Sequence, residues 1–471
     1  MRRTKLVCTI GPATVERVGE LVAAGMDVAR INFSHGTAER HAVAADRVRE
    51  AAEAAGRTVA ILVDLSGPKI RLGDFADGEV ELAPGAPFDL HPEPWPAGDA
   101  TGAHVGRALV GELAPGDRIL LADGAAELRV TGSDSVLHTQ VVRGGTVRSR
   151  AGVSVPAERL GGPSLTDRDR RDVPRAIKIG ADYVAQSFVR RASDIAELRS
   201  VLGPQGPPIV AKIETRPAVE DFDAICDVAD AIMLARGDLG VELPYEEVPI
   251  IQKQLLRRAL DRGVPTIVAT QMLESMIGSP RPTRAEASDV ANAIFDGADA
   301  IMLSGETAIG AFPVLAAEAA VRIAQLCEER GAELLPSGAM PRLGSDASAL
   351  AYAATTVASS EPDVSAIACY TRTGRTARMI AALRPRVPIL AYSPDPAVVR
   401  GLALVHGVEA RPCVPPPDTG GRLGLMAWLL GEDSSLRPGS AVVLVASTAI
   451  PGSGPNLLEV HRTPARGTSE A

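Results

Sequence analysis

The sequence predicts an α/β protein: a TIM (β/α)8 barrel, interrupted by an inserted small β-barrel lid and followed by a separate α/β domain. Three observations lead to this prediction. A turn-then-strand pattern recurs, eight short apolar runs alternate with helix-length segments, and polar residues gather where those runs end. We expect the barrel in residues 1–66 and 163–335, the lid in residues 67–162 and the third domain in residues 345–471.

The recurring pattern is a glycine, one further residue, an aspartate and an apolar run. It occurs at Gly25–Ala29, Gly180–Val184 and Gly297–Ile301, and Ala229–Leu234 repeats Ala298–Leu303 letter for letter. Glycine commonly ends a helix, so each occurrence indicates a helix that is followed by a buried strand. Recurrence along the chain predicts stacked βα units.

Eight apolar runs supply the eight strands that such a barrel needs. They are residues 4–10, 26–31, 58–64, 181–186, 208–214, 230–235, 264–270 and 299–304. A TIM barrel builds its active site at the C-terminal ends of its strands, which we call the rim. Polar residues crowd these ends, and one such cluster alone would be explained by loop capping. The rim candidates are Arg30, Asn32, Ser34, Asp64, Gln186, Ser187, Lys212, Glu214, Arg236, Asp238, Thr270, Gln271, Ser304 and Glu306.

Two segments depart from the barrel pattern. About a hundred residues after the third run are rich in Gly, Pro and short alternating runs, which predicts a β-barrel placed over the rim as a lid. Its clearest strands are Glu79–Leu82, Arg118–Leu121 and Glu127–Val130. Pro336–Pro341 has the composition of a linker. Buried strands beyond it predict the third domain: Ala366–Tyr370, Pro388–Tyr392 and Ala441–Val445.

Composition excludes several classes of function. The chain has 471 residues, a formal net charge of −9 and only 3% aromatic residues. This argues against wholesale binding to nucleic acid or to an anionic membrane. No apolar run reaches the roughly 18 residues of a membrane span, and a strand starts too early for a signal peptide. Five scattered cysteines predict reduced thiols in a cytoplasmic protein: Cys8, Cys226, Cys327, Cys369 and Cys413.

Lys212 lies in the apolar run Ile209–Glu214 of a chain that has five lysines among its 49 basic residues. A chain that fills its ordinary basic positions with arginine is expected to keep lysine where a compact ammonium is needed. Side chains alternate along a strand, so Lys212 and Glu214 share one face. A structural ion pair is one explanation. A buried charge is costly unless it is paired or used, which favours a functional site.

Glu214 and Asp238 end neighbouring strands of the predicted barrel. Two carboxylates suit Mg²⁺, which prefers one or two of them together with water and substrate phosphate. The nearby Lys212 and Arg236 favour an anionic substrate over the carboxylate pair of a glycosidase. Gly237 allows backbone N–H groups to approach an anion closely.

Several longer motifs resemble those of the pyruvate kinase family, in that family's order and over essentially the whole chain. They are Asp27–Gly36, Gly67–Arg71, Ala211–Glu214, Ala235–Gly240, Ala269–Met276, Pro280–Glu286 and Met302–Thr307. The resemblance implies phosphoryl transfer from phosphoenolpyruvate to ADP, which gives pyruvate and ATP in the last step of glycolysis. It also implies Mg²⁺ or Mn²⁺ as the cofactor, allosteric regulation and a homotetramer.

The resemblance also implies roles for the residues at matching positions. The implied catalytic residues are Lys212, Thr270, Ser304 and Arg30, of which Lys212 would stabilise the transition state. The implied substrate contacts are Arg30, Gly237, Asp238 and Thr270. The implied Mg²⁺ ligands are Glu214 and Asp238. The implied nucleotide contacts are Asn32, His35, Arg71 and Arg168, although the family often has Lys in place of Arg168.

Lys69 departs from a common pattern of the family. Many members have an acidic residue there and need K⁺, which is held at positions matching Asn32, Ser34, Asp64 and the Leu65 carbonyl. A fixed ammonium supplies the positive charge that K⁺ brings, so we expect activity without K⁺. The alternative is a solvated lysine that leaves the K⁺ requirement intact.

A second phosphate site is predicted in the third domain. Hydroxyls, a glycine and arginines between a strand and a helix suit a phosphate at a helix N-terminus. The residues are Thr371, Arg372, Thr373, Gly374, Arg375 and Thr376. The resemblance implies a phosphorylated effector here, with Pro451–Asn456 as the partner loop. A capped helix with solvated arginines is the alternative.

Two other functions stay open at this point. One is a catalytically silent homologue that only binds effectors, and the other is a barrel lyase or aldolase that acts on pyruvate-like substrates at the same Mg²⁺ site. The intact Lys212, Glu214 and Asp238 disfavour the first. The lid and the third domain disfavour the second.

Overall fold

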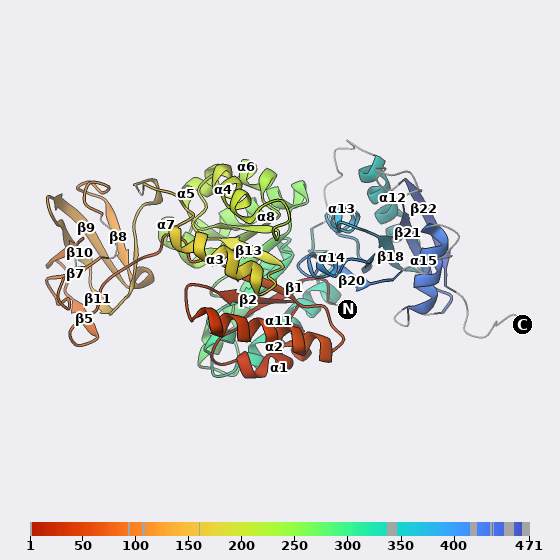
Figure 1. Cartoon of the computed structure of the whole chain (residues 1–471), viewed down its shortest axis with the longest axis horizontal. Helices are drawn as coiled ribbons and strands as arrows, with labels where there is room; N and C mark the ends of the chain where they lie inside the picture. Colours follow the sequence, from red (N-terminus) through yellow and green to blue (C-terminus); the bar gives the residue numbers. More distant parts are fainter. Residues whose placement is uncertain are drawn as a thin grey trace, which may run out of the picture.

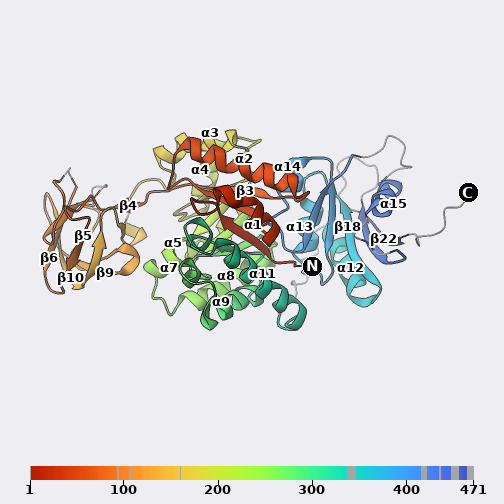
Figure 2. The same cartoon turned by 90° about the horizontal axis from the view of Figure 1, so that it is seen from below.

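The computed structural model describes residues 2–92, 95–105, 109–159, 161–336, 346–414, 422–433, 436, 438–446 and 456–463. Figure 1 shows three bodies in a row, with the barrel in the middle, the all-β insertion at one end and the C-terminal domain at the other. The turned view in Figure 2 shows the same order. The N-terminus lies where the barrel meets the C-terminal domain, so the chain starts at the end of the barrel opposite the insertion.

Eight parallel strands close into a barrel in the order β1-β17-β16-β15-β14-β13-β3-β2. They are β1 (Lys5–Thr9), β2 (Val28–Asn32), β3 (Ala60–Asp64), β13 (Tyr183–Gln186), β14 (Ile209–Ile213), β15 (Ala231–Ala235), β16 (Thr266–Ala269) and β17 (Ala300–Leu303). Every predicted barrel strand is therefore present, somewhat shorter than its apolar run. Nearly all their side chains are buried, because one face fills the barrel and the other packs on helices.

Helices surround the barrel. They are α1 (Val18–Ala24), α2 (Ala38–Ala54), α3 (Asp167–Lys178), α4 (Ala192–Leu202), α5 (Arg216–Glu220), α6 (Phe222–Val228), α7 (Arg236–Glu242), α8 (Val248–Arg262), α9 (Arg284–Phe295), α10 (Gly305–Ala308) and α11 (Pro313–Arg330). Short 3₁₀ turns lie at η1 (Val15–Arg17) and η4 (Glu274–Ile277). Thr166 caps α3 and Thr283 caps α9, each in a reciprocal capping box with an acidic residue three positions on. Gly25 ends α1 in the left-handed conformation, as its place in the recurring pattern predicts.

The insertion between β3 and β13 is all-β, as predicted. Its strands are β4 (Ile70–Arg71), β5 (Glu79–Leu82), β6 (Pro87–His91), β7 (Gly102–His104), β8 (Arg118–Leu121), β9 (Ala126–Ser133), β10 (Leu137–Arg143), β11 (Gly145–Arg148) and β12 (Gly152–Ser154), with 3₁₀ turns η2 (Ala122–Gly124) and η3 (Ala157–Arg159). They form a seven-stranded sheet, in the order β4-β12-β8-β9-β10-β6-β7, and a β11-β5 pair. Both contribute to one apolar core, so the insertion is a separately packed body. We call it the lid.

The C-terminal domain is an α/β sandwich around a five-stranded sheet of order β20-β19-β18-β21-β22. Its elements are α12 (Asp346–Ser360), β18 (Val364–Tyr370), α13 (Arg375–Ala381), β19 (Ile389–Ser393), α14 (Pro396–Arg400), β20 (Val408–Pro412), α15 (Arg422–Glu432), β21 (Ala441–Ala446) and β22 (Leu457–Arg462). β18, β19 and β21 are the three predicted strands. The predicted linker lies, apart from Pro336, outside the described residues. The domain boundaries proposed from the sequence stay predictions.

The C-terminal domain closes the end of the barrel that lies opposite the rim. Ala403 and Leu404, from the connection between α14 and β20, belong to the apolar cluster inside the barrel, together with Val7, Tyr183 and Met302. Leu404 is only 1% exposed. We call this end, where the N-terminal ends of the barrel strands meet residues 401–408, the floor.

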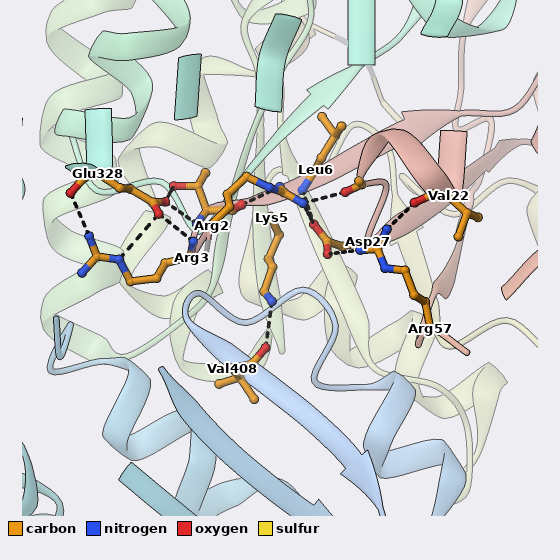
Figure 3. Close-up of polar contacts among 11 residues, drawn as sticks. Arg2, Arg3, Lys5, Leu6, Val22, Asp27, Arg57, Glu328 and Val408 are labelled. Atoms are coloured by element: carbon orange, nitrogen blue, oxygen red, sulfur yellow. Dashed lines mark hydrogen bonds and ion pairs between the residues drawn. The ribbon is translucent and has the colours of Figure 1, made fainter. Parts of the chain in front are cut away.

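Hydrogen bonds fasten the floor (Figure 3). Lys5 Nζ, on β1, donates to the carbonyl of Val408 at 2.7 Å. The Tyr183 hydroxyl donates to the carbonyl of Gly401 at 2.5 Å, and Arg400 forms a 2.7 Å ion pair with Asp182. The barrel and the C-terminal domain therefore share a polar interface around a common apolar plug.

No helix within the described ranges is long and apolar enough to cross a membrane.

Candidate active site

Lys212 lies on β14 with its side chain among acids and hydroxyls of three neighbouring strands. Nζ donates to Ser187 Oγ at 2.8 Å and lies 2.8 Å from Glu214 Oε1 and 3.3 Å from Asp64 Oδ1. Burial opposes the charged form, but the carboxylates of Asp64 and Glu214 outweigh it and raise the pKa of Lys212. Lys212 is therefore a fixed, charged ammonium, and the predicted sharing of one strand face with Glu214 is confirmed as an ion pair.

Arg30 lies in the middle of β2 and is also held by Asp64. Its Nε donates to Asp64 Oδ2 at 2.8 Å, its Nη2 lies 2.7 Å from the same oxygen, and its Nη1 donates to Thr9 Oγ1 at 2.9 Å. Burial would raise the pKa of Asp64, but Lys212 and Arg30 hold it below its ordinary value. One ionised carboxylate thus orients two cations toward the same part of the rim.

Glu214 and Asp238 follow β14 and β15, which are paired neighbours in the barrel. The backbone N–H of Phe188 donates to Glu214 Oε2 at 2.7 Å. Burial raises the pKa of Glu214 against the lowering effect of Lys212, and the nearby Asp238 carboxylate raises it further. An uncompensated second negative charge at this place fits a site for a divalent cation.

The donor set fits a hard cation that keeps open positions. The Asp238 carboxylate accepts no hydrogen bond from any residue that the structure describes. No group of three or more His, Cys, Asp or Glu side chains arranged for a metal occurs in the described parts of the chain. Two carboxylates alone suit Mg²⁺ better than Zn²⁺, because Mg²⁺ completes its coordination shell with water and substrate oxygens.

Gly237 and Thr270 meet across the gap between α7 and the end of β16. The Gly237 N–H donates to Thr270 Oγ1 at 2.7 Å, and a Cβ on Gly237 would lie 3.3 Å from that oxygen. Thr270 and Gln271 have φ of +70° and +55°, a conformation that side chains rarely adopt. Such strain persists where the surroundings impose it, and it is common at functional sites.

Arg236 imposes that loop conformation. Its guanidinium donates to both carboxylate oxygens of Asp289, at 2.7 and 2.6 Å, and to the Thr270 carbonyl at 2.9 Å. The sequence counted Arg236 among cations that favour an anionic substrate. In the structure its Nη1 and Nη2 are held by Asp289 and the Thr270 carbonyl, while its Nε is buried without a partner among the described residues.

Ser304 follows β17 at the start of α10. Its Oγ is buried and has no hydrogen-bond partner among the described residues, while its N–H donates to Glu306 Oε2 at 2.7 Å. Glu306 is completely buried and also accepts from the N–H of Leu273 at 3.0 Å. The backbone around Ser304 is therefore fixed while its hydroxyl stays available.

A second part of the site lies between the rim and the lid. A cavity of about 570 Å³ lies here. It is lined by Ser34 and by the two segments that join the barrel to the lid, within residues 66–71 and 161–168, which we call the lid hinges. Lys69, Arg71 and Arg168 belong to these hinges. Burial lowers the pKa of His35, and the charges of Arg71, Lys69, Arg30 and Arg168 lower it further, so these cations gather around it. The predicted residues Asn32 and His35 do not line this cavity themselves.

Three of the predicted K⁺ positions, Asn32, Ser34 and the Leu65 carbonyl, are hydrogen-bonded within the protein. The Asn32 side-chain oxygen accepts from the N–H of Ser34 at 3.0 Å, and the Leu65 carbonyl accepts from Ser187 Oγ at 2.7 Å. Lys69 is exposed and lines the same cavity as Ser34.

The predicted effector segment forms the turn between β18 and α13. Thr371 is buried, and its Oγ1 accepts from the N–H of Gly374 at 2.9 Å. Arg372, Thr373 and Arg375 are exposed. Of the predicted partner loop, Pro451–Pro455 lie outside the described residues.

Two contributors to the site were not identified as such from the sequence. Ser187 accepts from Lys212 and donates to the Leu65 carbonyl, so it fixes the ammonium against β3. Thr9 Oγ1 accepts a hydrogen bond from Arg30 Nη1 and so fixes the guanidinium. Ser187 was marked only as a polar strand end, and Thr9 carried no signal beyond its place at the end of β1.

The fold and the rim together define a barrel enzyme for phosphoryl transfer, with a fixed ammonium, a guanidinium and two carboxylates around one point. The family model for the pyruvate kinase barrel domain matches residues 1–317, and that for the pyruvate kinase alpha/beta domain matches residues 348–461. The chain belongs to the pyruvate kinase family.

Individual relatives agree over nearly the full length. The chain is 42% identical over 474 residues to a pyruvate kinase of Mycobacterium intracellulare, covering 98% of both chains. It is 41% identical to a pyruvate kinase of Geobacillus stearothermophilus, covering 98% of this chain and 80% of that one. A crystal structure of a pyruvate kinase from Cryptosporidium parvum superposes with a TM-score of 0.87 at 33% identity, covering 98% and 96% of the two chains. The chain is thus a phosphotransferase with pyruvate kinase function, and its family uses a divalent metal ion.

Proposed function

We propose that the rim carries out phosphoryl transfer from phosphoenolpyruvate to ADP, with Lys212 at the transferred group. The observation that carries this proposal is the position of Lys212 Nζ, fixed by Ser187, Glu214 and Asp64 within 3.3 Å. Phosphoryl transfer depends on positioning and on positive charge around the moving group. A fixed, buried ammonium stabilises developing charge without reorganisation.

The anionic substrate would be held at three points. Arg30 keeps guanidinium donors beyond those used by Asp64 and Thr9 and would bind the phosphate of phosphoenolpyruvate. The Gly237 N–H and Thr270 would bind the substrate carboxylate, which requires that their mutual hydrogen bond opens. Thr270 and the unpartnered Ser304 hydroxyl are suited to relay the proton that converts enolpyruvate into pyruvate.

Glu214 and Asp238 would hold the divalent ion, which we propose is Mg²⁺, with Mn²⁺ as a substitute. Bound there, the ion would bridge enzyme and substrate and neutralise charge on the phosphate. Asp238 offers open acceptors, and Glu214 is kept in place by the Phe188 N–H and Lys212.

The nucleotide would bind in the cavity between rim and lid. Arg71 and Arg168 line it and supply charge for the phosphates of ADP. Asn32 and His35, which do not line it, would contact the nucleotide from the rim. Lys69 lies in the same cavity, and we propose that its ammonium replaces K⁺ next to Asn32, Ser34, Asp64 and Leu65.

Regulation and assembly follow the family pattern in this proposal. The turn from Thr371 to Thr376 would bind a phosphorylated effector, since its exposed arginines flank backbone donors. We also propose a homotetramer in the cytoplasm. Five buried, unpaired cysteines support a reducing compartment.

The test is pyruvate formation from phosphoenolpyruvate with ADP and Mg²⁺, for the wild type, Lys212→Met and Lys178→Met. Lys178 is an exposed lysine at the end of α3 and serves as the matched control. We expect Lys212→Met to lower kcat by about 10²–10³ with a smaller change in KM, because the contact acts mainly in the transition state. Absence of wild-type activity across metals and effectors would favour a silent, effector-binding homologue. Equal losses in both variants would remove Lys212 from the chemistry.

A further inference from the structure

A partly open cavity lies at the floor, between the barrel and the C-terminal domain. It measures about 150 Å³, and its walls include Arg3, Ala298 and Glu328 of the barrel and Arg384, Arg386 and His406 of the C-terminal domain. Its lining residues Arg3, Gly297 and Ala298 lie just before β1 and β17, so it lies at the end of the barrel opposite the rim and is separate from the active site.

Among the residues that line this cavity, Arg384 has unusual hydrogen bonding. Its side chain is only 6% exposed, and its Nη2 donates to the Gly297 carbonyl at 2.6 Å and to Asp299 Oδ2 at 3.0 Å. Its Nε and Nη1 are buried without a hydrogen-bond partner among the described residues. A buried guanidinium with two idle donors is costly unless a ligand satisfies them.

The charge balance of the cavity favours an anion. Arg3 and Arg386 line it together with Arg384, while Glu328 is the single acidic wall residue. The Glu328 carboxylate is already occupied, because it accepts from the N–H groups of Arg3 and Thr4 at 2.7 Å each (Figure 3). Arg3 Nε lies 3.6 Å from Glu328 Oε2 and Arg384 Nη2 lies 3.0 Å from Asp299 Oδ2, so two carboxylates face three guanidinium groups and leave one net positive charge at the cavity.

The pKa of His406 is lowered by burial and by the same positive charges. His406 is 7% exposed, and burial lowers its pKa well below the ordinary value, with Arg384, Arg3 and Lys5 lowering it further. Its ring therefore stays neutral at physiological pH and adds no charge that would repel or attract an ion.

We infer that this floor cavity binds a small oxyanion, a phosphate or carboxylate group, through Arg384 and its neighbouring arginines. Arginine suits such groups because its planar fork donates two parallel hydrogen bonds. The ligand would contact the barrel through Arg3 and the C-terminal domain through Arg384 and Arg386. Its binding would thus stabilise the docked arrangement of the two domains, in addition to the effector site proposed between β18 and α13.

The test is calorimetric titration of the full chain with sodium phosphate, sodium acetate and sodium chloride at constant ionic strength. The variants are Arg384→Met and, as the matched control, Arg400→Met. Arg400 belongs to the same interface through its ion pair with Asp182 but does not line the cavity. Anion sites elsewhere, at the rim or the effector turn, are expected to be equal in all three proteins.

We expect the wild type and Arg400→Met to bind one more phosphate or acetate per chain than Arg384→Met does. Preference between the two anions identifies the ligand class, and an equal response to chloride would overturn the inference. Equal numbers of sites in wild type and Arg384→Met would also overturn it.

Ala332→Leu covers the case in which Arg384→Met does not fold. Ala332 lines the cavity and carries no charge, so a larger side chain there fills space without removing a donor. We expect it to lose the same single site, and retention of that site would contradict the inference.

Discussion

The charge and the position of Lys212 depend on its neighbours as much as on its own strand. A buried ammonium in an apolar barrel would be strongly disfavoured alone. Asp64 and Glu214 overcome this, and Asp64 also holds Arg30, so one carboxylate arranges two cations. The Asp64 carboxylate is occupied by contacts within the protein. Asp64 is therefore a positioning residue for Lys212 and Arg30.

We predict that Lys69 decides whether the protein requires K⁺. We expect the wild type to keep most of its rate when K⁺ is replaced by tetramethylammonium at equal ionic strength, because the ammonium already supplies a positive charge in the cavity. We expect Lys69→Glu to become dependent on K⁺. The rates of pyruvate formation in the two salts measure both effects.

Lys178→Glu makes the same change of charge at an exposed position and should behave as the wild type does. A large loss of wild-type rate without K⁺ would show that Lys69 is a solvated lysine of the hinge.

Lys212, Glu214 and Asp238 could be singled out from the sequence because each is a charged residue within or shortly after an apolar run. Such features are local and can be seen in one sequence. Ser187 and Thr9 were missed as partners because their value depends on which strands lie side by side. The sequence counted Arg236 only as a cation that favours an anionic substrate, and it did not show the pairing with Asp289, which is 53 residues away.

Among the elements, α7 links the rim to the lid. It begins at Arg236 and ends at Glu242, whose Oε2 accepts from the N–H of Ala157 at 3.3 Å. Ala157 belongs to η3, in the chain segment that returns from the lid to the barrel. The two ends of one short helix thus touch the Thr270 loop and this returning segment.

This contact depends on pH. Burial, helped by the charge of Glu158, raises the pKa of Glu242 to about 7, from an ordinary value of 4.5. The folded chain therefore holds this proton more tightly than the unfolded chain does. The resulting penalty is absent below about pH 4.5, grows as the pH rises to about 7 and is constant above it.

We expect Glu242→Gln to raise the thermal unfolding midpoint at pH 8 and to change it little at pH 5. The underlying free-energy difference is at most about 3 kcal/mol, from 1.36 kcal/mol for each pKa unit. Glu246→Gln, an exposed neighbour, should have no pH-dependent effect. A gain for Glu242→Gln that is equal at both pH values would contradict the assignment.

The barrel strands are the elements that the sequence predicted best. Each needs only a short apolar run bounded by turn residues, and eight such runs were present. β20 and β22 were not predicted, because both contain charged or half-exposed residues and so lack the apolar run of a buried strand. Edge strands of a sheet require pairing information that a single run does not contain.

At the scale of the whole molecule, the barrel is completed by the C-terminal domain. Leu404 and Ala403 fill its interior at the floor, so its core contains side chains from a segment 100 residues beyond the last barrel strand. Neither residue was identified from the sequence. Both lie in the apolar stretch from Leu402 to Val405, which could equally fill the core of their own domain.

The two leucines of that stretch separate the two cores. Leu402 is fully buried in the C-terminal core, whereas Leu404 is 1% exposed within the barrel. Leu402→Ala and Leu404→Ala remove the same atoms, and each should cost about 2–5 kcal/mol, since a cavity remains in a tightly packed core. The difference is where the cavity opens.

We expect Leu404→Ala to increase amide hydrogen exchange at the floor ends of β1 and β13, and Leu402→Ala to increase it in β18 and β19. Because Leu404 comes from the C-terminal domain and packs inside the barrel, its loss should also loosen the docking of the C-terminal domain, measured as faster exchange at the Val408 segment. If both variants raised exchange only within the C-terminal sheet, residues 401–408 would not complete the barrel. The floor would then be only a surface contact between the two domains.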